Sequence, residues 1–241
     1  PDRFNDLRAM FPKAHLLGCS TGGQIHGADL VDDSIASLAL RFDQTRLAMA
    51  TTGVDAERSA FAHGEEIGRQ LAAPDLAGVF VVCDGTSLNG GEFVAGITSE
   101  VGPNVIVTGG MAGDGTNFTT TIVGGDAPPR PLQMAAVGFY GSAIKIGCGV
   151  AAGWDGVGPR RRITRSSGPV LFELDGQPAL DIYEKYIGPE EAAKLPGSGL
   201  LFPFRIYNPV RPDHDIVRNV MYIDRQAKSI TFAGDVPRGW Q

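Results

Sequence analysis

The feature that most constrains this chain is an internal repeat. Residues 2–23 read DRFNDLRAMFPKAHLLGCSTGG, and residues 91–113 repeat the pattern as GEFVAGITSEVGPNVIVTGGMAG. In each copy, apolar residues recur at helical spacing, a proline follows, and a short apolar strand then leads into a glycine turn. Asn89, with Glu92 three residues later, is typical of the cap that starts a helix. The sequence therefore predicts two copies of a helix, a strand and a glycine turn.

The repeat continues after each turn. Residues 37–54 alternate apolar and polar side chains on both sides of a turn at Asp43, and residues 134–150 do the same around Gly141. Such alternation predicts half-buried hairpins. We therefore expect one hairpin in each copy.

A continuous apolar run at 79–83 predicts a buried strand before the second copy. No such run precedes the first copy, so we expect a strand upstream of Pro1. Apolar spacing over 60–71 predicts a helix between the copies. Together these elements predict an α/β domain over residues 1–160, internally duplicated, with layered mixed β-sheets and flanking helices.

A different pattern follows, which predicts a second α/β (α+β) domain over residues 165–241. Pro178 stands where a proline favours the first turn of a helix. The turn around Gly239 suggests that further chain follows. The predicted strands of this domain are 170–174, 200–207, 216–223 and 229–233.

Charge and cysteine content exclude several classes of protein. The formal net charge of −6 argues against a nucleic-acid surface. The basic cluster of Arg160, Arg161, Arg162 and Arg165 lies between glycines and prolines and is interpreted as a solvated linker. The three cysteines lack the spacing of a zinc site or a disulfide scaffold and are typical of a reducing cytoplasm. No apolar run is long enough for a membrane helix.

The first glycine turn matches a catalytic pattern. Gly18-Cys19-Ser20-Thr21-Gly22 fits G-x-S-x-G, the turn that presents the serine of many hydrolases. A hydrolase that uses Ser20 or Cys19 is therefore one alternative. The corresponding turn in the second copy keeps the glycines and has neither serine nor cysteine. We expect a structural turn and no enzymatic activity, because no complete catalytic constellation is visible.

The same turns are candidates for binding a small ligand. Their backbone N–H groups are suited to hold a carboxylate, and Asp84 or Asp114 is placed to meet an amine at the end of a strand. Arg205 and Arg218 are candidates for a bidentate clamp on the same carboxylate. The candidate ligand-binding residues are Cys19, Ser20, Thr21, Gly22, Gly110, Met111, Asp114, Arg205 and Arg218.

Several of these stretches together resemble a known family. LLGCSTGGQI, TGGMAGDGTNF and above all LFELDGQPALDIYEKYIG, followed by LLFPF and FAGDVPRG, are similar to the FIST family. In that family a FIST N-terminal domain precedes a FIST C-terminal domain. The resemblance implies a bacterial cytoplasmic sensory protein that binds a small ligand, with amino acids among those suggested. It also implies signalling to a histidine kinase or another output. No cofactor is expected, and the charge and the apolar pattern described above argue against nucleic acid and membrane insertion as partners.

One branch of the family implies a second alternative, a haem-based sensor of nitric oxide. The four histidines have no spacing typical of a metal site. His26 follows the first glycine turn and is the candidate axial ligand.

Overall fold

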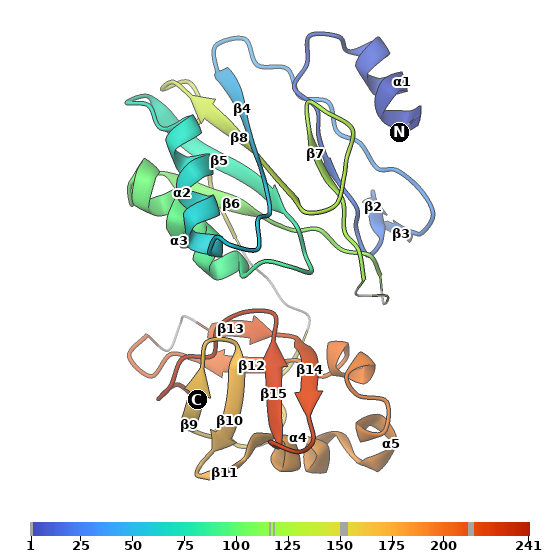
Figure 1. Cartoon of the computed structure of the whole chain (residues 1–241), viewed down its shortest axis with the longest axis vertical. Coiled ribbons are helices and arrows are strands. Elements are labelled where there is room, and N and C mark those ends of the chain that lie inside the picture. The colour runs from blue at the N-terminus through green and yellow to red at the C-terminus, as the bar shows by residue number, and fades with distance from the viewer. Residues whose placement is uncertain (1, 116, 118, 150–153, 212–214) are drawn as a thin grey trace. The chain divides into compact units, whose positions relative to one another are not determined.

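A computed structural model of the chain describes residues 2–115, 117, 119–149, 154–211 and 215–241 (Figure 1). The chain divides into two compact units, Pro1–Gly149 and Val150–Gln241. Val150, the expected end of the second hairpin, and His214 lie outside the described residues. The mixed α/β class expected from the sequence is confirmed, with several sheets and flanking helices.

Unit 1 is built on a four-stranded sheet in the order β4-β8-β5-β6. β5 and β6 run parallel, whereas β8 pairs antiparallel with both β4 and β5. The predicted strand at 79–83 is the end of β5, where side chains on both faces are mostly buried, as expected for a strand between two layers. The four strands are β4 (Arg46–Gly53), β5 (Leu76–Cys83), β6 (Ile106–Met111) and β8 (Gln133–Tyr140).

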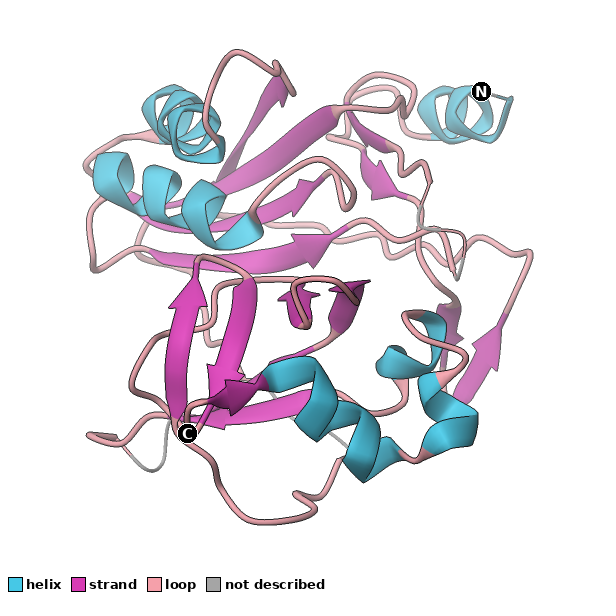
Figure 2. Ribbon diagram, turned by 60° about the horizontal axis from the view of Figure 1, so that its bottom comes forward, coloured by secondary structure: helices cyan, strands magenta, loops and turns pink. Residues whose placement is uncertain are grey.

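Two helices, α2 (Ala60–Leu71) and α3 (Gly90–Val101), cover one face of this sheet (Figures 1 and 2). α3 begins as predicted, because the Asn89 side chain accepts a hydrogen bond from the Glu92 N–H at 3.2 Å. The two helices pack closely. A Cβ atom on Gly96 would lie 2.1 Å from the Phe61 carbonyl oxygen, so this crossing requires glycine. The core between helices and sheet includes Ile67, Leu71, Val79, Val81, Phe93, Ile97, Met134 and Ala136.

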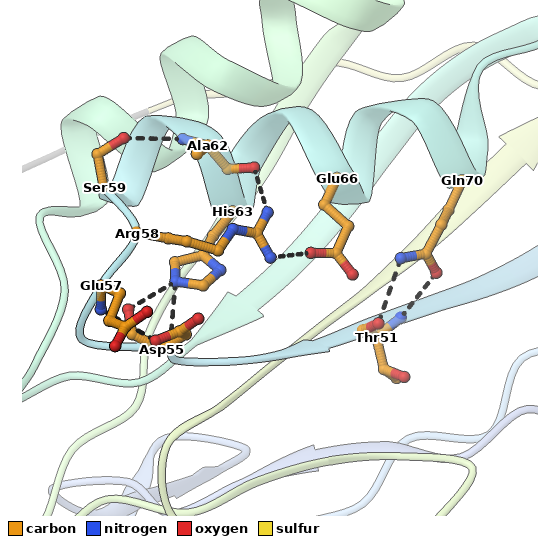
Figure 3. A network of polar contacts seen from close by, with 9 residues as sticks. All are labelled: Thr51, Asp55, Glu57, Arg58, Ser59, Ala62, His63, Glu66 and Gln70. Carbon is orange, nitrogen blue, oxygen red and sulfur yellow. Dashed lines mark hydrogen bonds and ion pairs between the residues drawn. The ribbon is translucent and has the colours of Figure 1, made fainter.

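A polar network joins the edge strand β4 to α2 (Figure 3). The Gln70 side chain donates to the Thr51 carbonyl at 3.3 Å and accepts from the Thr51 N–H at 3.4 Å. These bonds occupy backbone groups that an edge strand leaves open. At the start of α2, the Ser59 hydroxyl accepts from the Ala62 N–H, and buried His63 contacts the backbone of Asp55. The side chains of α2 thus hold the loop that leads out of β4.

The other face of the sheet carries a smaller layer. β1 (Leu17–Cys19) pairs antiparallel with β7 (Val123–Gly125). Val82, Ala112, Val123 and Ala135 form the small core beneath this pair, with Leu17, Cys19 and Met49 packed against it. α1 (Asp2–Met10) precedes β1, and a short hairpin of β2 (Gln24–His26) and β3 (Asp29–Val31) follows it.

The repeated helix, strand and turn are observed twice, as α1–β1 and α3–β6. The two predicted hairpins are wrong. The first copy forms only the returning strand, β4, and the second forms only the outgoing strand, β8. These strands pair with each other over eight residues. β8 also pairs with β5, so both of its edges are occupied and the second hairpin cannot close on it. Within the described residues the opposite arms, at 38–42 and 144–149, form no strand.

Unit 2 contains a five-stranded sheet in the order β11-β10-β15-β14, with β9 also paired to β10. The predicted strands at 170–174 and 229–233 are confirmed as β10 and β15. A separate two-stranded sheet joins β12 to β13. The strands are β9 (Ile163–Ser167), β10 (Val170–Leu174), β11 (Gln177–Pro178), β12 (Phe204–Tyr207), β13 (Asp215–Arg218), β14 (Val220–Asp224) and β15 (Ser229–Phe232).

The main helix of unit 2 is α4 (Ala179–Ile187), which buries one face against the core of this unit. Pro178 was predicted in the first turn of this helix, but it is the N-cap residue and α4 begins at Ala179. Two shorter helical segments follow, α5 (Pro189–Ala192) and the 3₁₀ turn η1 (Gly197–Leu200). Across the described parts of the chain, the helices are too short or too polar to cross a membrane.

Three further expectations for this unit are corrected. The predicted strand at 200–207 begins in η1, and only its end is β12. The predicted strand at 216–223 is two strands, β13 and β14, separated at Asn219. The presumed linker contains β9, because Ile163 is buried in the core and Arg165 pairs with Glu173 on β10 at 2.8 Å.

Candidate ligand-binding site

The two glycine turns of unit 1 lie against each other. The Gly113 N–H donates to the Ser20 carbonyl at 3.0 Å. A Cβ atom on Gly113 would lie 3.0 Å from the Gly22 nitrogen, which leaves little room for a larger residue. The structure therefore brings together the candidate segments Cys19–Gly22 and Gly110–Asp114.

Hydrogen bonds within the fold use some of the amides that were predicted to cradle a carboxylate. The Ser20 N–H donates to the Ile122 carbonyl, and the Ala112 N–H donates to the Cys83 carbonyl. The Gly113 N–H donates to the Ser20 carbonyl, as described above. Three backbone amides of the two turns are therefore used within the fold. These three N–H groups therefore stabilise the fold.

The backbone after Ser20 does not have the structure that the hydrolase alternative requires. The pattern requires a helix after the serine, whereas Ser20 is followed by a turn and then by the strand β2. The Ser20 hydroxyl accepts a hydrogen bond from the Ile122 N–H at 3.0 Å. Burial raises the pKa of the Cys19 thiol, which opposes formation of the nucleophilic thiolate. Neither side chain is activated by the contacts that the structure shows.

The remaining turn residues lie close by. The Thr21 hydroxyl accepts from the Gln24 side chain at 2.9 Å. Gly110 and Met111 end β6, and the Met111 side chain is about two-fifths exposed, at 39%. These residues belong to the two joined turns or lie directly beside them.

Asp84 and Asp114, the candidate partners of a ligand amine, are engaged by their own loops. Asp84 is 1% exposed and accepts from the Thr121 hydroxyl at 2.7 Å and from the Ser87 N–H at 2.8 Å. Asp114 accepts from the Thr119 N–H at 2.7 Å. Both carboxylates therefore stabilise turns, as aspartate commonly does.

The predicted clamp of Arg205 and Arg218 is wrong. In the β12–β13 pair, Phe204 lies opposite Arg218 and Arg205 lies opposite Val217. Residues that face each other across a ladder share a side of the sheet, and neighbours along a strand alternate. The two arginines therefore project from opposite faces. Arg218 instead donates from Nε to the Asp235 carbonyl at 2.9 Å.

Unit 2 contains a cavity of about 670 Å³, within the range of small-molecule sites. Its floor consists of core side chains such as Leu171 and Leu174, and its rim includes the exposed side chains of Val157 and Leu201. The lining comprises residues 154–161, Ile163, Leu171, Leu174, Ile182, Tyr183, Tyr186, Ile187, residues 201–207, Val217 and Gln241.

One wall of the cavity is held by Tyr183 of α4. Its hydroxyl donates to the Phe202 carbonyl at 2.8 Å, which ties the segment 201–207 to the helix. Burial raises the pKa of Tyr183 to about 12, so this hydroxyl stays protonated. The wall is therefore fixed by a neutral hydrogen bond at neutral pH.

Arginines surround one part of the lining. The Arg160 Cζ atom lies 3.7 Å from the centroid of the Tyr207 ring, and the Arg205 Cζ atom lies 5.4 Å from it. Arg161 donates to the Asp175 carboxylate at 3.1 Å and to the Tyr186 hydroxyl at 3.4 Å. Its Nε atom is buried and meets no acceptor among the described residues. Arg160 and Arg161, which were interpreted as part of a solvated linker, thus line the cavity, whereas Arg162 and Arg165 do not.

The haem alternative rests on His26, the candidate axial ligand. His26 lies on the exposed strand β2 in unit 1, next to Ile25, which is 75% exposed. No histidine, cysteine or methionine among the described residues lines the cavity of unit 2. Among the described residues, no group of three or more His, Cys, Asp or Glu side chains is placed to hold a metal ion.

Two family models match this chain. The FIST N domain matches residues 1–177 and the FIST C domain matches residues 179–241, in the order that the sequence predicted. The chain belongs to the FIST family. FIST domains are associated with sensory signal transduction and with the binding of small ligands. The FIST N match extends beyond unit 1 through β9 and β10.

A curated relative of this FIST protein is an uncharacterized protein of the archaeon Methanocaldococcus jannaschii. It is 26% identical over 211 residues, which cover 80% of this chain and 38% of the relative. The chain thus spans about two-fifths of the length of that relative. No solved structure matches the chain.

The cavity was missed by reasoning from the sequence. Its lining comes from segments between Trp154 and Gln241 that are far apart along the chain. The available signal was the nearness of aromatic and basic residues in the sequence, with Trp154 six residues before Arg160 and Tyr207 two residues after Arg205.

Proposed function

We propose that this FIST protein is a small-ligand sensor and that the cavity of unit 2 is its ligand-binding site. The observation that carries the proposal is the cavity itself. It has the volume of a metabolite site, an apolar floor and a few polar groups at one part of its lining. The family association with sensing supplies the biological role.

The proposed mechanism is a shift of population. A ligand that fills the cavity contacts α4 and the segment 201–207 at once, and it stabilises the arrangement in which both are in place. A partner that distinguishes this arrangement from the empty one reads the signal. We propose a cytoplasmic histidine kinase, or another signalling output, as that partner.

Native mass spectrometry of the freshly purified chain tests the binding site. We expect a bound small molecule that is released on denaturation. Val157 stands at the rim of the cavity and is 90% exposed, and a tryptophan there narrows the mouth. Val157→Trp is expected to lose the bound mass.

Val210→Trp is the matched control. Val210 belongs to the same unit, is 85% exposed and does not line the cavity. It should therefore retain the bound mass. A wild-type chain without any bound molecule, or equal retention by the two variants, would contradict the assignment of this cavity.

A further inference from the structure

The lining of the cavity in unit 2 has more cationic than anionic side chains. Among the described residues it includes the three arginines Arg160, Arg161 and Arg205 and one acidic side chain, Asp155. Two carboxylates outside the lining pair with these arginines, Asp175 with Arg161 and Asp215 with Arg205. A lining with an excess of cationic side chains attracts ligands of the opposite charge.

Two of these cations are held beside a single ring. Arg160 and Arg205 both approach Tyr207, at 3.7 Å and 5.4 Å from its centroid. Arg205 is also paired with Asp215, whereas no carboxylate among the described residues pairs with Arg160. Arg160 is thus held in place by stacking, with its five N–H donors left for an incoming group.

The third cation has an unsatisfied donor. Two terminal nitrogens of Arg161 are used by Asp175 and Tyr186, and its Nε–H is buried without an acceptor in the described structure. Buried donors are nearly always satisfied in folded proteins. The Arg161 guanidinium thus has one donor that no group in the described fold uses.

The rest of the lining suits a flat apolar body. Aromatic side chains from three segments, Trp154, Tyr186 and Phe202, border the cavity and are each partly exposed. Aromatic rings in such positions bind planar groups by stacking and by excluding water. The cavity thus combines an apolar part with a cationic one.

From these contacts we infer that the cavity binds an amphipathic organic anion, an aromatic carboxylate whose acid group meets Arg160 and Arg161. This inference rests on the proposed function, since it assumes that the cavity is the binding site. Guanidinium groups match a carboxylate through paired, charge-assisted hydrogen bonds. The aromatic part of the ligand lies among Trp154, Tyr186 and Phe202.

Isothermal titration of the full chain with matched probes tests the charge requirement. The probes are benzoate, 2-naphthoate and indole-3-acetate, each compared with its neutral amide. We expect at least one acid to bind about tenfold more tightly than its amide, and the difference to shrink as NaCl is raised from 50 to 500 mM.

Variants test the assigned side chains. Arg160→Gln removes the exposed, unpaired charge and should weaken binding of the acid at least fivefold, with little effect on the amide. Arg238→Gln removes an exposed charge of the same unit outside the lining and should change neither affinity. Thermal melts of both variants check that the fold is retained.

The outcomes separate the two proposals. Equal affinity for acid and amide, both lost in Val157→Trp, would leave the cavity as the binding site and overturn the anionic ligand class. Failure of all six probes to bind would overturn the inference and count against the cavity. An unchanged affinity of Arg160→Gln for the acid would also overturn the inference.

Discussion

The backbone N–H of Gly113 lies 3.0 Å from the carbonyl oxygen of Ser20 and donates to it. This bond joins the glycine turns of the two sequence copies, whose residues are 93 positions apart by number (113 − 20). The serine that matches a hydrolase pattern is therefore part of the contact between the copies. Its hydroxyl accepts a hydrogen bond from the N–H of Ile122, the residue before β7.

Ser20→Ala is expected to act on stability and not on catalysis. Loss of the acceptor for the Ile122 N–H should lower the free energy of unfolding by about 1 kcal/mol, as measured by urea denaturation. Hydrolysis of p-nitrophenyl acetate by the wild type should match that of Ser20→Ala. Loss of an ester-hydrolase activity in the variant would restore the catalytic alternative.

Two adjacent glycines of β6 allow a test substitution and its control in the same strand. Gly109 has φ +146, and a Cβ atom there would lie 1.8 Å from the Val81 carbonyl oxygen, whereas Gly110 has nothing within 4 Å. Gly109→Ala should lower the free energy of unfolding by about 2–3 kcal/mol, because backbone must move. Gly110→Ala should stay within about 0.5 kcal/mol of the wild type. Equal effects in urea denaturation would show that the clash is relieved at no cost.

The elements that the sequence predicted correctly are those with local signals. The Asn89 cap starts α3, and the apolar run at 79–83 is buried in β5 whatever its neighbours. Strand pairing is not local. The alternation at 37–54 predicted a strand on each side of Asp43, but the choice of β8 as the partner of β4 depends on a segment about 90 residues away.

In the candidate site too, features with a local sequence signal could be predicted and features that depend on distant segments could not. The repeat identified the two glycine turns from the sequence, whereas the contact between them is seen only in the structure. Arg205 and Arg218 were both assigned to strands, but which face each occupies depends on the β12–β13 register. The cavity depends on tertiary packing of α4 against the segment 201–207. Both overlap stretches that resemble the FIST family, but neither stretch by itself indicates a cavity.

The buried carboxylate of Asp84 predicts a pH dependence of stability. Burial by itself would raise the pKa of Asp84, but hydrogen bonds from Thr121 and from the backbone of Thr86 and Ser87 outweigh it and lower the pKa below its ordinary value. A carboxyl group with a lowered folded-state pKa stabilises the fold above its unfolded pKa of about 3.9 and loses this effect as the pH falls through the folded-state pKa.

Asp84→Asn should therefore unfold more easily than the wild type at pH 7, by about 1–3 kcal/mol. The gap should close as the pH is lowered below about 4. Asp43→Asn is the control, since the Asp43 side chain is 84% exposed and its pair with Arg41 spans 3.6 Å. Its effect should stay within about 0.5 kcal/mol at every pH. A gap for Asp84→Asn that does not change with pH would show that the lowered pKa contributes nothing to stability.

The three cysteines should react in a fixed order. Cys148 is exposed, Cys19 is partly buried and Cys83 is buried. Burial raises the pKa of Cys83 to about 12, so at pH 8 only about one thiol in ten thousand is the reactive thiolate. Alkylation with iodoacetamide at pH 8, followed by peptide mass spectrometry, should label Cys148 first, Cys19 more slowly and Cys83 only when the chain unfolds. Addition of urea above the unfolding midpoint should make the three rates similar, because the differences arise from burial. Rapid labelling of Cys83 in the folded chain would contradict its place in the core beneath α2 and α3.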